Sequence, residues 1–449
     1  MPHPSVRCWS VSDSFLRSCF SGCSGCTGRY GCPVVGIADM TFSSDGKELN
    51  PRVSTPAHII MKLAMIGFGQ AGGKIADKFL EYDQVTDSSI VQSAIAVNTA
   101  EADLLGLEYI PSENQVLIGQ ARVKGHGVGA DNELGAEIAE EDIDEIQDAV
   151  DNVPVHEIDA FLIIAGLGGG TGSGGSPVLA KHLKRIYTEP VYGLGILPGS
   201  DEGGIYTLNA ARSFKTFVQE VDNLLVFDND AWRKTGESVE SGYDQINEEI
   251  VRRFGVLFGA GEVSSREEVA ESVVDSSEVI NTLASGGVST VGYDAEEVRE
   301  YGSGGLLSRF RSNSGDADSA NTTNRITSLV RKAALGRLTL PCEIQGAERA
   351  LLVVSGPSKY LNRKGIERGR KWLEEQTGSM EVRGGDYPLD EPNVASSVLL
   401  SGVHDVPRIK ELQQVAIEAQ DNIDNIEQES EENLESLVQD QDDELDPLF

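Results

Sequence analysis

Two glycine-rich segments carry the strongest chemical signal in the sequence. The first, Gly67–Lys74 (GFGQAGGK), follows a short apolar run and precedes a helical pattern. The second, Gly166–Gly175 (GLGGGTGSGG), combines seven glycines with the hydroxyls of Thr171 and Ser173. A backbone without Cβ atoms can turn several N–H groups toward one anion, and a helix that begins there adds the positive end of its dipole. Together the segments predict a site that holds a polyphosphate between two helix N-termini.

The first segment also allows a second hypothesis. Gly67, Gly69 and Gly72 fit G-x-G-x-x-G, the dinucleotide-binding pattern of many oxidoreductases. Such a site needs an acidic residue at the end of the second strand to bind the ribose. Here that strand ends in Val97-Asn98-Thr99, without an acid, and no Walker lysine follows the second segment. The pattern therefore favours a phosphate-binding loop over an NAD site, and a P-loop ATPase does not fit.

Apolar runs alternate with helical patterns over the first half of the chain. This alternation predicts a mostly parallel sheet covered by helices on both faces. Strands are expected at 61–66, 93–97, 116–118, 160–165, 191–197 and 223–227, and helices at 74–82, 132–150, 176–187 and between the last two strands.

The second half predicts a long helix and a smaller α+β domain. From Gly242 onward, Ile246, Ile250, Phe254 and Leu257 recur at helical spacing and form one apolar stripe. A mobile loop is expected at 302–324, a basic helix at 325–335, and short strands at 350–354, 380–382 and 397–400.

The chain is strongly acidic, with 72 Asp and Glu against 37 Lys and Arg and a net charge of −35. This charge argues against a nucleic-acid partner, because duplex binding needs a basic face. No apolar run reaches the roughly 18 residues of a membrane-spanning helix, so no transmembrane segment is expected. Acids outnumber bases even without the acidic end of the chain. This favours adaptation to molar KCl over an ordinary protein with one acidic tail.

The cysteines gather at the start of the chain. Five of the six lie within the first 32 residues, and Cys342 stands alone in the rest. A disordered leader at 1–60, or translation from a start codon upstream of Met61, is favoured over a small zinc or disulfide module. A body with one cysteine has no structural disulfide and fits the cytoplasm. At the other end, Leu445–Phe449 restores apolar side chains and suggests a docking peptide or an ordinary terminus.

Four motifs resemble the tubulin and FtsZ superfamily. Gly168–Gly174 (GGGTGSG) is similar to its signature, and GFGQAGGK, VNTAEADL at 97–104 and GHGVGAD at 125–131 occur in its order and spacing. Within the superfamily the acidic body looks most like CetZ, the haloarchaeal tubulin-like group. The resemblance implies an α/β fold with a parallel-sheet GTP-binding domain, a long central helix and a smaller C-terminal α+β domain with an acidic activating loop. The expected boundaries are a leader at 1–60, these three parts at 61–241, 242–262 and 263–408, and an acidic disordered tail at 409–449.

The resemblance also implies which residues bind GTP or GDP with Mg²⁺. Glu202 stands where an acid binds the ribose hydroxyls, and Asn229 and Asn247 would recognise guanine through their amides, with Tyr243 stacked on the base. No metal site built from protein side chains is expected. The phosphates would lie against Gln70, Ala71, Gly72, Gly73, Lys74, Gly168, Gly169, Gly170, Thr171, Gly172, Ser173 and Gly174.

Two acids after the central helix match the activating loop of the superfamily. In the family this loop enters the nucleotide pocket of the next subunit, and Asp275 and Glu278 would orient the attacking water. The usual Asn-x-Asp-Phe-x-Asp has become Val-Val-Asp-Ser-Ser-Glu here, so slow hydrolysis is expected.

The implied function is that of a cytoplasmic cytoskeletal GTPase that polymerises head-to-tail and controls archaeal cell shape. Its partners would be other copies of itself, paralogous subunits and a membrane adaptor or regulator at the tail. The alternatives are a GTP-binding polymer scaffold with little or no hydrolysis, and an FtsZ paralogue of cell division.

Overall fold

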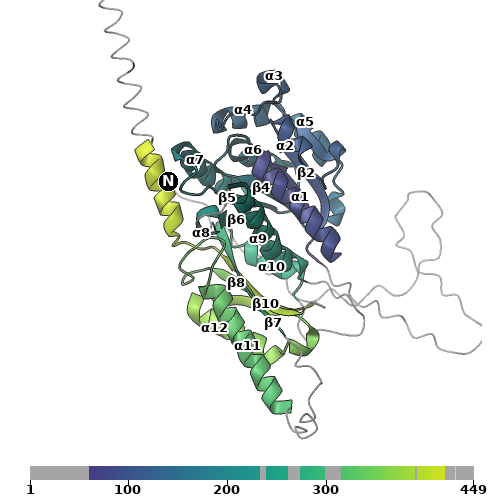
Figure 1. The fold of residues 1–449 in the computed structure, drawn as a ribbon, viewed down its shortest axis with the longest axis vertical. Helices are drawn as coiled ribbons and strands as arrows, with labels where there is room; N and C mark the ends of the chain where they lie inside the picture. Colours follow the sequence, from purple (N-terminus) through teal and green to yellow (C-terminus); the bar gives the residue numbers. More distant parts are fainter. Residues whose placement is uncertain are drawn as a thin grey trace, which may run out of the picture. The chain divides into compact units, whose positions relative to one another are not determined.

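The computed structural model describes residues 60–232, 239–260, 274–298, 315–389 and 392–419, together with residue 430. In this part of the chain the strands β1 to β10 form one sheet, in the order β3-β2-β1-β4-β5-β6-β7-β10-β8-β9. Figure 1 shows the sheet with its surrounding helices. The strands are β1 (Leu63–Phe68), β2 (Val91–Asn98), β3 (Gln115–Leu117), β4 (Ala160–Gly166), β5 (Val191–Leu197), β6 (Asn223–Asp228), β7 (Val288–Glu297), β8 (Arg349–Gly356), β9 (Glu381–Pro388) and β10 (Asn393–Ser401).

The strands from β3 to β6 pair in parallel; the edge strand β3 is half-buried, and β1, β4, β5 and β6 are almost entirely buried. This is the near-continuous apolar pattern of a sheet covered on both faces. β7 joins the end of this series through two parallel pairs, Leu224 with Val288 and Leu225 with Ser289. β10 then pairs antiparallel with both β7 and β8, and β9 closes the sheet in parallel with β8. The C-terminal strands therefore continue the sheet of the N-terminal half.

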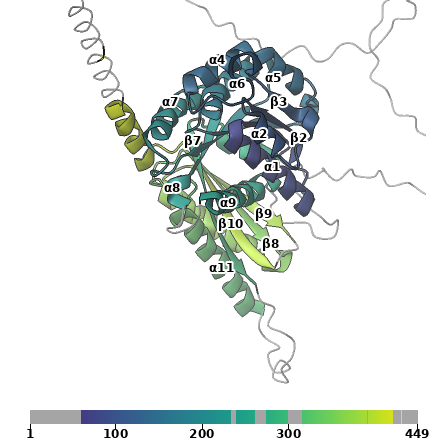
Figure 2. The same ribbon diagram turned by 45° about the horizontal axis from the view of Figure 1, so that its top comes forward.

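Helices cover the two faces of the sheet as two separate hydrophobic layers. One face carries α4 (Asn132–Glu141), α5 (Ile143–Val150), α6 (Thr171–Ile186), α7 (Gly204–Glu220), α11 (Gly315–Leu335) and α12 (Arg363–Thr377). The other carries α1 (Gly69–Thr86), α2 (Glu101–Leu105), α9 (Val239–Gly259) and α10 (Ser276–Leu283). The short α3 (Gln120–Val123) and α8 (Asn229–Trp232) lie in connections. In Figures 1 and 2, α9 runs between the first group of strands and the C-terminal strands.

The expected parallel sheet and long central helix are confirmed, and several boundaries differ. The helix expected at 132–150 is two helices, because Asp142 breaks it and accepts a hydrogen bond from the Gly119 N–H at 2.5 Å. The helix expected at 176–187 begins five residues earlier at Thr171, so half of the second glycine segment is helical. The loop expected at 302–324 ends sooner, because α11 begins at Gly315; its earlier part lies outside the described residues.

The beginning of the expected tail is helical rather than unfolded. Residues 407–419 form a helix, in which Leu412 is buried and Ile409 packs against the core. Arg408 anchors this helix by donating to the carbonyl of Pro198 at 3.0 Å. The composition of this segment predicted disorder, because composition does not reveal contacts with distant parts of the chain. Residues 1–59 of the predicted leader, and the predicted tail beyond 419 apart from residue 430, lie outside the described residues.

Candidate functional site

A cavity of about 430 Å³ lies at the carboxyl ends of the parallel strands. This is the edge where ligands bind in open α/β sheets, because the loops and helix N-termini face outward there. The cavity is lined by Phe68, Gly69, Gln70, Ala71, Lys74, Ile75, Asn98, Ala100, Asp103, His126, Gly127, Val128, Gly129, Ala130, Gly166, Gly168, Gly169, Gly170, Thr171, Gly172, Ile196, Pro198, Glu202, Tyr206, Asn229, Tyr243 and Asn247.

Both glycine segments open a helix at this cavity. α1 begins at Gly69 and α6 at Thr171, and neither helix has an acidic residue in its first turn. The positive dipole ends are therefore not neutralised by the helices' own side chains, which suits an anionic ligand.

The two segments pack too closely to admit side chains at key positions. Gly69 has φ +72°, and a Cβ there would lie 2.8 Å from the N atom of Gly172. A Cβ at Gly170 would lie 2.4 Å from a methyl carbon of Val128. In contrast, a Cβ at Gly169 would meet no atom within 4 Å, so this glycine borders open space. The two glycine segments, Gly67–Lys74 and Gly166–Gly175, therefore present backbone atoms to the cavity, and we call this surface the cradle.

Polar side chains fix the rim of the cradle. The Gln70 amide donates to Asp103 at 2.8 Å, and the Asn98 amide donates to the same carboxylate at 3.1 Å. The hydroxyls of Thr99 and Thr171 lie 2.7 Å apart and join the end of β2 to the start of α6. Sequence patterns did not reveal two parts of this lining: Asn98, which counted only as the missing ribose acid, and His126–Ala130 of the GHGVGAD motif.

The opposite end of the cavity carries amides. Asn229, at the end of β6, is buried, and its Oδ1 has no hydrogen-bond partner. An unpartnered buried carbonyl oxygen is costly and fits a ligand that donates to it. Tyr243 and Asn247 reach the same cavity from α9. Glu202 also lines it, and its carboxylate accepts from the Gly199 N–H at 2.7 Å.

Four of the residues expected around the phosphates do not line the cavity. Gly72 and Gly73 are buried within α1, and a Cβ at Gly72 would lie 2.0 Å from the carbonyl oxygen of Ile164. A Cβ at Gly174 would lie 2.1 Å from the carbonyl oxygen of Asn132, and the hydroxyl of the buried Ser173 donates back to Gly170 at 3.2 Å. Gly72 and Gly174 have no room for a side chain, because backbone packs directly behind the cradle at both positions.

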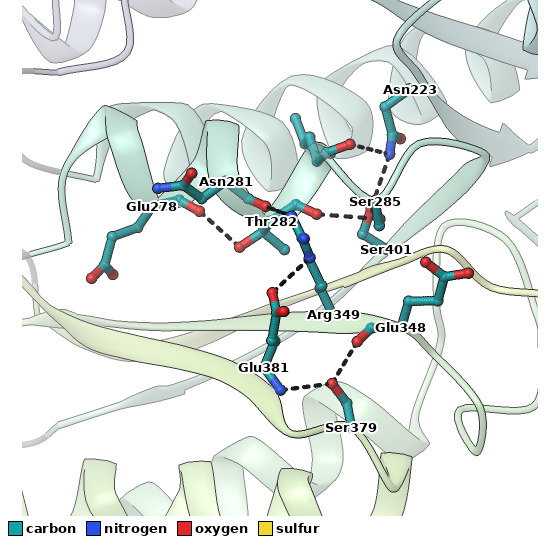
Figure 3. Close-up of polar contacts among 11 residues, drawn as sticks. Asn223, Glu278, Asn281, Thr282, Ser285, Glu348, Arg349, Ser379, Glu381 and Ser401 are labelled. Carbon is teal, nitrogen blue, oxygen red and sulfur yellow. Dashed lines mark hydrogen bonds and ion pairs between the residues drawn. The ribbon is translucent and has the colours of Figure 1, made fainter. Parts of the chain in front are cut away.

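Asp275 and Glu278 lie at the other edge of the sheet. Asp275 caps α10, and Glu278 stands in the first turn of that helix. The end of α10 contacts Asn223, the first residue of β6, whereas the cavity lies beyond the last residue of that strand. In one chain the structure thus does not bring the two acids to the cavity. Figure 3 shows the Glu278 carboxylate pointing away from the Arg349 side chain.

The surroundings of Glu278 alter its acidity. Burial raises the pKa of the Glu278 carboxyl, the charge of Asp275 raises it further, and the Arg383 guanidinium opposes the rise. Glu278 and Arg383 line a hollow of about 310 Å³ together with Arg363 and Arg370. Glu367 and Asp386 line it too, so three arginines face three acids at the edge that carries Glu278.

The described residues contain no group of three or more His, Cys, Asp or Glu side chains placed to hold a metal ion. No helix in the described ranges is both long and apolar enough to cross a membrane. A larger hollow of about 750 Å³ between α9 and α11, lined by Trp232 and several arginines, includes neither glycine segment.

A ten-stranded sheet, two glycine loops at adjoining helix N-termini and a central helix that reaches the cavity define a nucleotide-binding protein of the tubulin type. Residues 62–237 match the family described as Tubulin/FtsZ family, GTPase domain, and residues 236–418 match Tubulin-like CetZ, C-terminal domain. Tubulin-like protein CetZ1 of Haloferax volcanii is 77% identical over 374 residues, which cover 82% of this chain and 95% of the relative. The chain belongs to the CetZ family of tubulin-like GTPases.

Two solved structures are similar to most of this chain. The GDP-bound monomer of Haloferax volcanii CetZ1 has a TM-score of 0.72 at 74% identity and covers 80% of this chain and 100% of its own. The GTPγS-bound protofilament of CetZ2 from the same organism has a TM-score of 0.72 at 46% identity and covers 81% and 100%.

Proposed function

We propose that this protein assembles head-to-tail into filaments and hydrolyses GTP at the junction between subunits. The observation that carries the proposal is the separation of the cavity and the acids to opposite edges of one sheet. A contact between two different faces of identical subunits is heterologous and produces open filaments when it does not close a ring. The GTPγS-bound protofilament of the similar CetZ2 supports this arrangement.

In this proposal the cradle binds the nucleotide phosphates. Gln70–Lys74 and Gly168–Gly174 surround them. Within these ranges, four residues do not line the cavity and would support the backbone of the cradle: Gly72, Gly73, Ser173 and Gly174. Mg²⁺, which prefers phosphate oxygens and waters to an all-protein cage, would offset charge on the phosphates.

The other end of the cavity selects the nucleoside. The unpartnered Asn229 Oδ1 would accept from the guanine edge, and Asn247 would add an amide donor and acceptor. Tyr243 would stack on the base, and Glu202 would accept from the ribose hydroxyls.

Asp275 and Glu278 of the neighbouring subunit would orient and partly deprotonate the attacking water. Assembly would then switch on hydrolysis, and GDP would weaken the junction. A weakly hydrolysing scaffold is the second candidate. One observation favours this scaffold: the Asp275 carboxylate already caps α10. It accepts hydrogen bonds from the Ser277 hydroxyl at 2.5 Å and from the Glu278 N–H at 3.2 Å.

The cellular role would be control of archaeal cell shape from the cytoplasm. Haloferax volcanii has both a CetZ1 and a CetZ2, which supports paralogous subunits as partners. The apolar tip Leu445–Phe449 would dock an adaptor or regulator.

The decisive experiment measures GTP turnover per subunit against protein concentration, in molar KCl with Mg²⁺. A rise from near zero above a threshold concentration supports the site shared between subunits. A flat, measurable rate would place catalysis within one subunit and contradict it. Tight GTP binding without turnover would support the scaffold instead, and no GTP binding would contradict both.

A further inference from the structure

The carboxyl end of the acid-bearing helix α10 is held by side chains from outside the helix. The Arg349 guanidinium, from the first residue of β8, donates to the carbonyl of Asn281. The Asn223 amide, from the first residue of β6, donates to the carbonyl of Leu283 at 2.9 Å. Such donors satisfy carbonyls that a helix end leaves free, and a cation there also faces the negative end of the dipole (Figure 3).

Arg349 is itself fixed by Glu381. Its Nε lies 2.7 Å from a Glu381 carboxylate oxygen, and the two residues are direct neighbours in the pairing of β8 with β9. The Glu381 N–H donates to the Ser379 hydroxyl at 3.1 Å, and that hydroxyl donates to the Glu348 carbonyl at 2.6 Å. One guanidinium therefore bridges the helix carbonyl and the carboxylate of Glu381, a residue whose backbone is held by Ser379.

The bridge belongs to a row that crosses four strands. Ser289 pairs with Ser401, Ser401 with Arg349, and Arg349 with Glu381. By strand alternation these side chains share a face with Leu351 and Leu399, which belong to the hydrophobic layer that includes α10. Ser401 also accepts from the Asn223 amide at 2.9 Å and lies 2.7 Å from the Ser285 hydroxyl. The row thus ties the end of α10 to both halves of the sheet.

We propose that Arg349 is a positioning residue for GTP hydrolysis, because its bridge to Asn281 and Glu381 sets where α10 holds Asp275 and Glu278. This inference rests on the proposed function of those two acids. α10 has eight residues and is therefore roughly 12 Å long. A helix this short is not stable alone, so its position depends on the contacts at its ends. A shift of its carboxyl end therefore also moves Asp275 and Glu278 at its amino end. A misplacement of about 1 Å in a reacting group can lower a rate about 100-fold.

Arg349→Gln in the full chain tests the proposal. We expect turnover per assembled subunit to fall about 10- to 100-fold. GTP affinity and the threshold concentration for assembly should stay within about twofold, since the bridge touches neither the cavity nor the Asp275 cap. Phosphate release by pelleted filaments gives the rate, and sedimentation gives the threshold.

Conservative variants distinguish positioning from a general structural role. Arg349→Lys keeps the charge and one of the two contacts, so it should restore part of the turnover lost in Arg349→Gln. Glu381→Gln leaves Arg349 able to reach Asn281 and should lose less. Arg325→Gln is the matched control: its pair with Glu296 spans 3.5 Å at similar exposure and lies away from α10, so turnover should not change.

The double variant Arg349→Gln/Asp275→Asn tests whether Arg349 acts through the two acids. If Arg349 acts through the acids, Arg349→Gln should reduce turnover less in that background than alone. Unchanged turnover per assembled subunit in Arg349→Gln and Glu381→Gln would overturn the inference, as would full additivity with Asp275→Asn. If Asp275→Asn and Glu278→Gln themselves leave turnover unchanged, the proposed function is wrong whatever Arg349 does.

Discussion

The backbone N–H of Glu278 donates to the carboxylate of Asp275 over 3.2 Å, so the two acids of α10 form a single unit. The Ser277 hydroxyl donates to the same carboxylate at 2.5 Å. Asp275 therefore has two functions in the proposed mechanism, because the group that would act on water also caps the helix that carries its partner.

Asp275→Asn separates these two functions. Asparagine caps a helix as well as aspartate does, so α10 and filament assembly should remain while the charge is lost. We expect turnover per assembled subunit to fall about 100-fold or more, the usual contribution of a general base. Asp275→Ala should show the same loss and also lower stability by about 1 kcal/mol in thermal or denaturant unfolding. Equal turnover in the wild type and Asp275→Asn would contradict the assignment.

Arg383 should control the acid limb of the pH profile. Its guanidinium opposes the rise in the pKa of Glu278 that burial and Asp275 cause. Arg383→Gln removes that opposition, so the pKa of Glu278 should rise further and the carboxylate should be lost at a higher pH. The acid limb of turnover against pH should therefore move to higher pH. Lys410→Gln, a change at an exposed pair with Asp405, is the control and should leave the profile in place. A shift to lower pH would refute the prediction.

Two glycines of the second segment should respond differently to alanine. A Cβ at Gly174 would lie 2.1 Å from a backbone carbonyl oxygen outside the cavity, so Gly174→Ala should lower stability by about 1–3 kcal/mol. A Cβ at Gly169 meets no atom within 4 Å, so Gly169→Ala should leave thermal unfolding almost unchanged. It should still weaken GTP binding, because Gly169 lines the cradle. Tight binding by Gly169→Ala would show that the phosphates lie elsewhere.

Stability should depend strongly on salt. A net charge of −35 destabilises a compact state through self-repulsion, and molar KCl screens that repulsion within a few ångströms. The midpoint of thermal unfolding should therefore fall on dilution from molar to about 0.15 M KCl, a physiological ionic strength. Added uncharged osmolyte should not replace the salt fully. A constant midpoint over this range would favour an ordinary acidic protein.

Local patterns predicted much of the nucleotide-binding half. Strand β5 spans 191–197 as expected, and β4 extends only one residue beyond the expected 160–165. These strands are apolar runs between turn residues, so their neighbours in sequence define them. Helix 407–419 was missed because its polar sequence gains its few buried contacts, such as Leu412, only from the folded body. The break at Asp142 was missed for the same kind of reason, since its partner Gly119 is 23 residues away.

The sequence by itself determined the chemistry of the cradle, because glycine spacing between a strand and a helix is a local property of the chain. Only the tertiary structure decided where the second half of the chain places Asp275 and Glu278. The hydrogen bonds from Asn223 to Leu283 and from Arg349 to Asn281 join residues 60 and 68 positions apart. β7 enters the sheet through just two pairs with β6. That long-range pairing places Asp275 and Glu278 at the other edge of the sheet, and no local pattern encodes it.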